Sequence, residues 1–211
     1  MVFEKNYKIQ LTDDAFRRAD EAPDEKFYAI PRFTSHIDLY AIEAVTEIYR
    51  QYIPENTAVL DLMSSLLSHL PEEIHYQRVV GLGMNAREMA NNKQLTDSLV
   101  HDLNINPILP FGNNDFGAGL ICVSIDYLVQ PVAVLKEMGR VLKSKSPLII
   151  TYSNRFFETK ATAAWLSLSD DQRAYLIKSF LTEAGCFEDI ELMDRSPKAA
   201  DPLFAVVARV V

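Results

Sequence analysis

The 211-residue sequence has few of the residues that mark particular protein classes. It contains only two cysteines, Cys122 and Cys186, both in apolar stretches, so we interpret them as reduced, buried thiols rather than a disulfide or a metal pair. No apolar run reaches the roughly 18 residues that a membrane-spanning helix needs, and the charged N-terminus does not resemble a signal peptide. We therefore expect a cytoplasmic protein with no membrane partner.

Basic residues are also in deficit. The 21 Lys and Arg residues stand against 29 Asp and Glu residues, which gives a net charge of −8. Nucleic-acid binding depends on a basic surface, so we do not expect a nucleic-acid partner. The acidic balance is compatible with a cationic ligand and equally with simple solubility. A homodimer is compatible with the sequence, which leaves the oligomeric state open.

Glycine is scarce, with seven residues in the whole chain. Two of them, Gly81 and Gly83, form a G-x-G-x-x-A pattern after an apolar stretch and before a short helical one, and Asp102 follows roughly 20 residues later. These are the parts of a dinucleotide-binding unit, so an NAD(P)-binding Rossmann enzyme is one alternative. Against it, such a turn normally follows the first strand, whereas another strand-like stretch comes earlier here.

From residue 57 onward, short apolar stretches alternate with helical ones. Pro131 suits the first turn of a helix, and Val134, Leu135, Met138 and Val141 give that helix one apolar face. This alternation predicts an α/β fold, with ligands at the carboxyl ends of the strands. The expected strands are 58–62, 78–82, 98–101, 120–124, 148–153, 190–193 and 203–210.

Residues 1–56 form a lead-in to this domain, which spans 57–211. A stripe from Ile37 to Tyr52 repeats at helical spacing and ends before Pro54. The aromatic, proline-containing stretch 27–33 is more typical of an ordered loop. We expect the lead-in to form an N-terminal helical lid.

The segment 116–150 resembles the class I S-adenosylmethionine (AdoMet)-dependent methyltransferases, in particular the broad small-molecule group. The resemblance covers about residues 57–211 and implies a Rossmann-like, seven-stranded mixed sheet of order 3-2-1-4-5-7-6. It also implies AdoMet as cofactor and methyl transfer to a small-molecule acceptor. Gly117 replaces the second acid of the pattern, and 144–146 replaces its Pro-Gly-Gly. The matching residues are Phe116, Leu128, Pro131, Leu135, Glu137, Arg140, Val141, Leu142, Lys143, Leu148, Ile149 and Ile150.

The first motif of the family matches only in part. Asp61 ends the expected strand 58–62, as the family pattern requires, but Met63, Ser64 and Ser65 follow where the family has a glycine-rich loop. The two serines either donate to the cofactor carboxylate at the start of a following helix or only cap that helix. The missing glycines also leave open a degenerate, non-catalytic relative that binds a ligand or partner.

The other motifs nominate further cofactor contacts. The ribose-binding acid of the family falls on Gly83, so Asn85 or Glu88 would have to replace it. Asp102 and Leu103 occupy the adenine-binding positions. The resemblance implies that the residues directly after the fourth strand face the sulfonium of AdoMet, where they could serve as electrostatic partners or as a base. These are Ser124, Asp126 and Tyr127.

The acceptor is expected between the lead-in and the segment after the fifth strand. His36 is a candidate base, although a lone histidine is often structural. Arg32 and Arg155, each near aromatics, either clamp an anionic acceptor or form surface ion pairs. Trp165 is expected to be half-buried. The residues nominated there are Tyr28, Arg32, His36, Asp38, Asn154, Arg155, Lys160 and Trp165.

Overall fold

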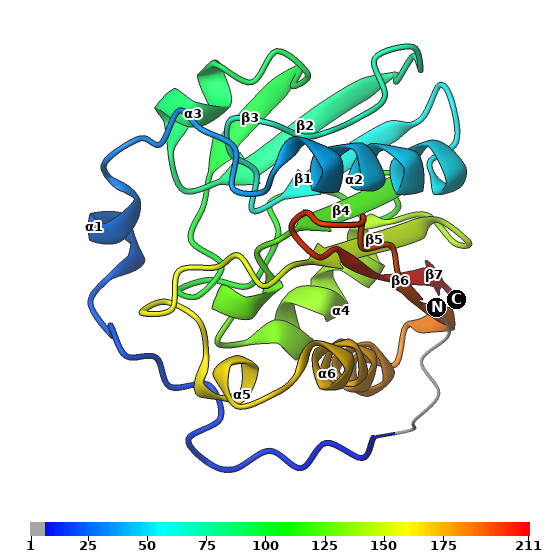
Figure 1. Ribbon diagram of the computed structural model, residues 1–211. Coiled ribbons are helices and arrows are strands. Elements are labelled where there is room, and N and C mark those ends of the chain that lie inside the picture. The colour runs from blue at the N-terminus through cyan, green and yellow to red at the C-terminus, as the bar shows by residue number, and fades with distance from the viewer. Residues whose placement is uncertain (1–6) are drawn as a thin grey trace.

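The computed structural model describes residues 7–211; positions 1–6 of the expected lead-in lie outside it (Figure 1). One seven-stranded sheet has the order β3-β2-β1-β4-β5-β7-β6, which confirms the order implied by the resemblance. The strand β7 is antiparallel to both of its neighbours, whereas the other pairs are parallel. The strands are β1 (Ala58–Leu62), β2 (Arg78–Gly83), β3 (Asp97–Val100), β4 (Ala118–Cys122), β5 (Pro147–Tyr152), β6 (Phe187–Asp194) and β7 (Phe204–Val210).

Helices cover both faces of this sheet. In Figure 1, α2 lies along one face, and α4 and α6 lie together on the other. Every residue of β1 and β5 is buried, which explains why their sequences are continuous apolar runs rather than alternating ones. The helices are α1 (Asp24–Tyr28), α2 (Leu39–Tyr52), α3 (Ala86–Ala90), α4 (Pro131–Val141), α5 (Ala163–Leu166) and α6 (Asp170–Ala184), with a 3₁₀ turn at Ile125–Tyr127.

The lead-in contributes both a helix of the core and a loop. Ala41, Val45, Ile48 and Tyr49 of α2 are buried against strand residues of the same apolar cluster, so this helix packs as part of the sheet domain. The stretch 27–33, expected to be a loop, begins in the short helix α1 and continues as a loop from residue 29. No helix in the part of the chain from residue 7 onward is long and apolar enough to cross a membrane.

The helix expected after β1 is absent. Residues 63–77 form an irregular loop instead. The Ser64 and Ser68 hydroxyls both donate to Asp61, so they fold the loop back onto the end of β1, and such local bonds compete with helix formation. His69 then adopts a left-handed φ of 56°, and Pro71 disfavours helical geometry in the residue before it.

Two residues expected at the acceptor are interior instead. Lys160 is fully buried, and its ammonium lies 3.1 Å from Asp24 and 3.2 Å from Asp20. Asp24 also accepts from Arg18 at 2.9 Å, so this ion network fastens the lead-in to the segment before α5. Trp165 is 2% exposed rather than half-buried, with its ring edge-on to Tyr152.

Candidate functional site

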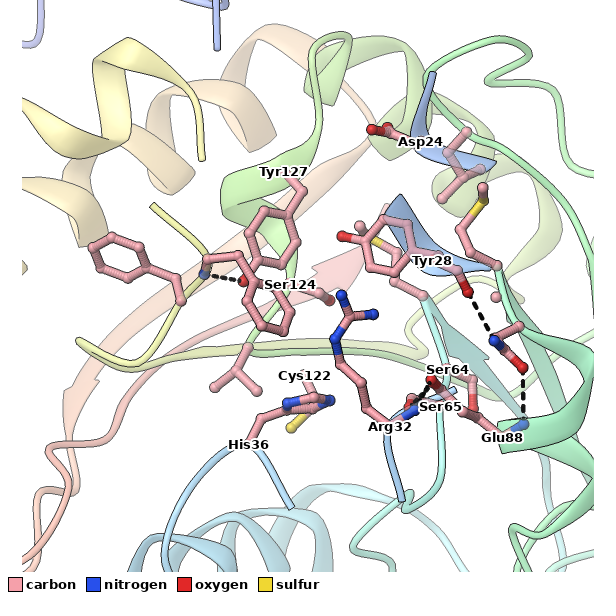
Figure 2. Close-up of a pocket in the computed structure, with 18 of the residues that line it drawn as sticks. Asp24, Tyr28, Arg32, His36, Ser64, Ser65, Glu88, Cys122, Ser124 and Tyr127 are labelled. Carbon is pink, nitrogen blue, oxygen red and sulfur yellow. Dashed lines mark hydrogen bonds between the residues drawn. The ribbon is translucent and has the colours of Figure 1, made fainter. Parts of the chain in front are cut away.

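A cleft of about 410 Å³ opens at the carboxyl ends of β1, β2 and β4, between the lead-in on one side and residues 154–158 on the other (Figure 2). Its size lies in the ordinary range for small-molecule sites. The strand register brings these ends together, because Leu62 lies beside both Leu82 and Ile121. The expected cofactor-binding and catalytic residues all line this cleft except Asp126, whereas Asp38, Lys160 and Trp165 of the acceptor candidates do not.

Asp61 is buried at the end of β1. One of its carboxylate oxygens accepts from the Ser64 hydroxyl at 2.6 Å and from the Ser68 hydroxyl at 2.7 Å. Burial raises the pKa of Asp61 to about 6, although the two serines act in the opposite direction. The Ser64 side chain is therefore engaged with Asp61, and it caps no helix.

Met63, at a position where the family pattern has glycine, adopts a backbone geometry that favours glycine. Its φ is 60°, in the left-handed region that costs a non-glycine residue roughly 1–2 kcal/mol. The loop thus starts along a glycine-like path, with a methionine side chain added at the cleft.

Packing within the protein requires glycine at position 83 and leaves little room for a side chain at position 81. A Cβ at position 83 would lie 2.0 Å from the backbone oxygen of Ser64, and one at position 81 would lie 2.6 Å from a methyl group of Leu95. The absence of side chains at these two positions therefore lets the loop that follows β1 pack directly on β2. This contact accounts for the pair without a dinucleotide phosphate.

Glu88, one of the two expected replacements for the ribose-binding acid, lines the cleft. It is buried, and its two carboxylate oxygens accept from the Arg32 backbone N–H at 2.7 Å and from the Ser65 hydroxyl at 2.5 Å. Asn85 caps α3 and donates to the Tyr28 carbonyl at 2.7 Å. Both groups therefore also fasten the lead-in over the cleft (Figure 2).

Asp102 and Leu103 lie where the adenine is expected. One oxygen of Asp102 accepts from the backbone N–H groups of Asn104 at 2.9 Å and Ile105 at 3.3 Å, which stabilises the turn that follows β3. The other carboxylate oxygen has no hydrogen bond from residues 7–211. Leu103 is 4% exposed and forms an apolar wall of the cleft.

The segment after β4 is strained. Val123 has a φ of 42°, which is unusual for a β-branched residue, and it precedes Ser124, whose hydroxyl is buried without a hydrogen-bond partner in the described chain. Tyr127 accepts from the Phe157 N–H at 2.9 Å, and burial holds the pKa of its phenol well above the usual value. Strain of this kind gathers at functional sites.

Asp126 does not face the cleft, contrary to the expectation that it meets the sulfonium. It is 3% exposed, and one of its carboxylate oxygens has no partner within the described residues. Burial raises the pKa of Asp126 to about 8. Asp126 lies in a tight 3₁₀ turn. The side chains of Ser124 and Tyr127 line the cleft, whereas the side chain of Asp126 lies in the interior.

The acceptor side contains several ionisable groups. Desolvation lowers the pKa of His36, opposed by nearby Glu88, and desolvation lowers the pKa of His69 to about 4. Arg155 is exposed and lies 3.5 Å from Asp201. Asn154, also exposed, lines the same rim.

Asp38, expected near the acceptor, caps α2 instead and accepts from the Ala41 N–H at 2.9 Å. Residues 7–211 contain no group of three or more His, Cys, Asp or Glu side chains placed to hold a metal ion. Burial raises the pKa of Cys122, which lines the cleft, to about 11.

Sequence reasoning missed several residues of the cleft wall. Phe157 and Glu158 directly follow the nominated Asn154 and Arg155, so extending that segment would have found them. No pattern singled out His69, because its place depends on the irregular loop after β1. The residues missed include Asp24, Leu67, His69, Asn104, Cys122, Val123, Phe157 and Glu158.

Neither a family model nor a curated protein sequence matches this chain. Solved structures do. A methyltransferase from Haloferax volcanii, in complex with the activator Trm112, is 13% identical with a TM-score of 0.60, covering 81% of this chain and 90% of that one. A SAM-dependent methyltransferase from Aquifex aeolicus is 18% identical with a TM-score of 0.57, covering 89% and 97%.

The [4+2]-cyclase SpnF is also similar, at 14% identity and a TM-score of 0.56, covering 80% of this chain and 81% of that one. At these identities the likeness establishes the fold. Together with the sheet order, it shows that the protein has the class I, AdoMet-dependent methyltransferase fold.

Proposed function

We propose that the protein binds AdoMet and transfers its methyl group to a small-molecule acceptor. The observation that carries this proposal is the cleft at the ends of β1, β2 and β4. It gathers the residues at the first three motif positions, although they are far apart in the sequence. This is where open α/β sheets bind ligands.

The residues present fit AdoMet at the adenosine end. Asp102 offers a free carboxylate oxygen to an adenine amino group, and Leu103 offers an apolar surface to the ring. Glu88 is our candidate acceptor for the ribose hydroxyls, and the unpartnered Ser124 hydroxyl is our candidate contact for the methionine end. When bound, AdoMet supplies an electrophilic methyl group on a sulfonium.

The residues around the acceptor orient it and can accept a proton. Methyl transfer depends mainly on in-line positioning and on exclusion of water. Tyr127, whose pKa is raised, stays a neutral hydrogen-bonding group at physiological pH. His36, whose pKa is lowered, is neutral there, so it is the candidate to take a proton from an acceptor that must lose one.

The experiment that tests the activity follows methyl transfer directly. The protein is incubated with trideuteromethyl-labelled AdoMet and a small-molecule metabolite extract, and products are sought by mass spectrometry. We expect a labelled product whose yield falls with Ser124→Ala, which removes the unpartnered hydroxyl without adding bulk. A labelled product formed equally by heat-inactivated protein, or none from the folded protein, contradicts methyl transfer.

A second candidate function is ligand binding without methyl transfer. One observation favours it: the loop after β1 carries Met63 and Ser65 where the family has glycines, and the backbone oxygen of Ser64 packs against Gly83. A solved neighbour with this fold is a cyclase, so the fold alone does not determine the reaction. AdoMet binding without any labelled product supports this candidate.

A further inference from the structure

Arg32 is a cation in the cleft without a carboxylate partner. Its guanidinium lies over the Phe27 ring at 4.6 Å and the Phe157 ring at 4.9 Å, with the Tyr28 ring at 5.8 Å. Figure 2 shows the side chain reaching between Tyr28 and Tyr127, toward the middle of the residues drawn. The described chain places no carboxylate within 4.0 Å of this guanidinium, although the protein carries a net charge of −8.

The acids of the cleft are mostly engaged elsewhere. Asp24 pairs with Arg18 and Lys160. Asp61 accepts from two serine hydroxyls, and Glu88 accepts from the backbone N–H of Arg32 rather than from its guanidinium. The Arg32 side chain therefore faces the cleft without a carboxylate as ion-pair partner among residues 7–211.

The remaining donors of Arg32 point in the plane of its guanidinium. One terminal nitrogen donates to the Phe27 carbonyl at 3.2 Å and the other reaches the Ile30 carbonyl at 3.5 Å. The three aromatic rings gather on one side of the group, and its N–H edge is left to meet a ligand in the cleft. A guanidinium edge matches the two oxygens of a carboxylate.

We propose that Arg32 is the carboxylate-binding residue of this cleft. This inference rests on the proposed function, because a carboxylate there has two sources. It is either the methionine carboxylate of the cofactor, which the glycine-poor loop holds less completely, or a carboxylate of the acceptor. The His36 ring and Arg155, which line the same rim, add no negative charge that would oppose either one.

The test compares two cofactor-like ligands by calorimetry. S-adenosylhomocysteine carries the amino acid tail, whereas 5′-methylthioadenosine lacks it. Benzoate, a simple carboxylate, is titrated separately into the free protein and into the protein saturated with S-adenosylhomocysteine. The variants are Arg32→Gln, Arg32→Lys, which keeps the charge but not the fork, and Arg87→Gln as control, because Arg87 is exposed and lies outside the cleft.

If the cofactor supplies the carboxylate, Arg32→Gln weakens S-adenosylhomocysteine about tenfold or more and leaves 5′-methylthioadenosine nearly unchanged. If the acceptor supplies it, both nucleosides keep their affinity, and benzoate binding to the saturated protein is lost. Arg32→Lys falls between, and Arg87→Gln behaves as wild type. Equal binding of all three ligands by wild type and Arg32→Gln overturns the inference.

Failure of the proposed function has a different signature. If wild type binds neither nucleoside, AdoMet binding is excluded, and the benzoate titration of the free protein then decides the role of Arg32 alone. Loss of benzoate binding in Arg32→Gln supports a carboxylate site for another ligand. No benzoate binding by wild type, or none that depends on Arg32, overturns it.

Discussion

Gly83 and the backbone oxygen of Ser64 approach so closely that a Cβ at position 83 would lie 2.0 Å from that oxygen. The Ser64 N–H also donates to the Leu82 carbonyl at 2.9 Å, so the loop after β1 is held directly on the end of β2. This contact forms the floor of the cleft. It explains a glycine that the sequence pattern alone suggested for a dinucleotide phosphate.

Gly83→Ala should destabilise the protein by about 1–3 kcal/mol or more, because the Ser64 backbone and the Met89 sulfur leave no room for the methyl group. Gly112→Ala is the control, since nothing lies within 4 Å of a Cβ there, and it should stay within about 0.5 kcal/mol. Chemical denaturation measures both. Equal stabilities for the two variants would show that the loop does not pack on β2 as described.

Met63→Gly and Ser65→Gly should differ in stability, although the sequence alone predicts a loss of up to about 1 kcal/mol from each added glycine. Glycine at 63 relieves a left-handed φ, which offsets the entropy of the unfolded chain. Glycine at 65 removes the 2.5 Å hydrogen bond to Glu88, a loss of about 1–3 kcal/mol.

We therefore expect Ser65→Gly to melt below Met63→Gly, and the reverse order would contradict the geometry of this loop. The same two variants report on ligand access. If the Met63 side chain obstructs the cofactor, Met63→Gly tightens binding of S-adenosylhomocysteine.

Asp102→Asn should weaken binding of S-adenosylhomocysteine by about 1–3 kcal/mol, because an amide places a donor where the adenine amino group needs an acceptor. The asparagine oxygen can still accept from Asn104 and Ile105, so the turn and the melting temperature should be kept. Asp102→Ala would also remove the hydrogen bonds that stabilise the turn, so a loss of binding could not be separated from a loss of stability. An unchanged dissociation constant in the folded Asn variant removes Asp102 from the site.

Asp126→Asn should change how stability depends on pH. Burial raises the pKa of Asp126 to about 8 in the folded state, from about 4 in the unfolded chain. The folded state therefore holds the extra proton, and wild-type stability falls as pH rises from about 4 to about 8, by at most ~1.4 kcal/mol per pH unit.

Asparagine cannot ionise. The melting temperature of Asp126→Asn minus that of wild type should therefore rise between pH 5 and pH 8. Asp13→Asn, at an exposed residue, controls for the change in net charge. A constant difference for Asp126→Asn across this range would mean that the carboxyl is not buried as a neutral acid.

The central strands β1 and β5 and the helix α4 were predictable because burial on both faces of a sheet and on one face of a helix leaves a clear apolar pattern. The loop after β1 was not. Leu66, Leu67 and Leu70 are compatible with a helix, but the hydrogen bonds from Ser64 and Ser68 to Asp61 and the left-handed φ of His69 hold this segment as a loop.

The site was predictable where the family pattern places residues at strand ends, as for Asp61, Asp102 and Ser124. The site was not predictable where a tight turn determines which of two neighbouring side chains lines the cleft, as for Asp126 and Tyr127. The buried Lys160 shows a further limit, because a lysine becomes interior only when distant carboxylates such as Asp24 compensate its charge.

Calorimetric titration of the wild-type protein with S-adenosylhomocysteine, AdoMet, NADH and NADPH tests the central claim most directly. The cleft account predicts that S-adenosylhomocysteine and AdoMet bind with one site per chain, and that either binds more tightly than both nicotinamide cofactors. Micromolar binding of NADPH with no response to S-adenosylhomocysteine would contradict the account and restore the Gly81 and Gly83 fingerprint as the nucleotide site.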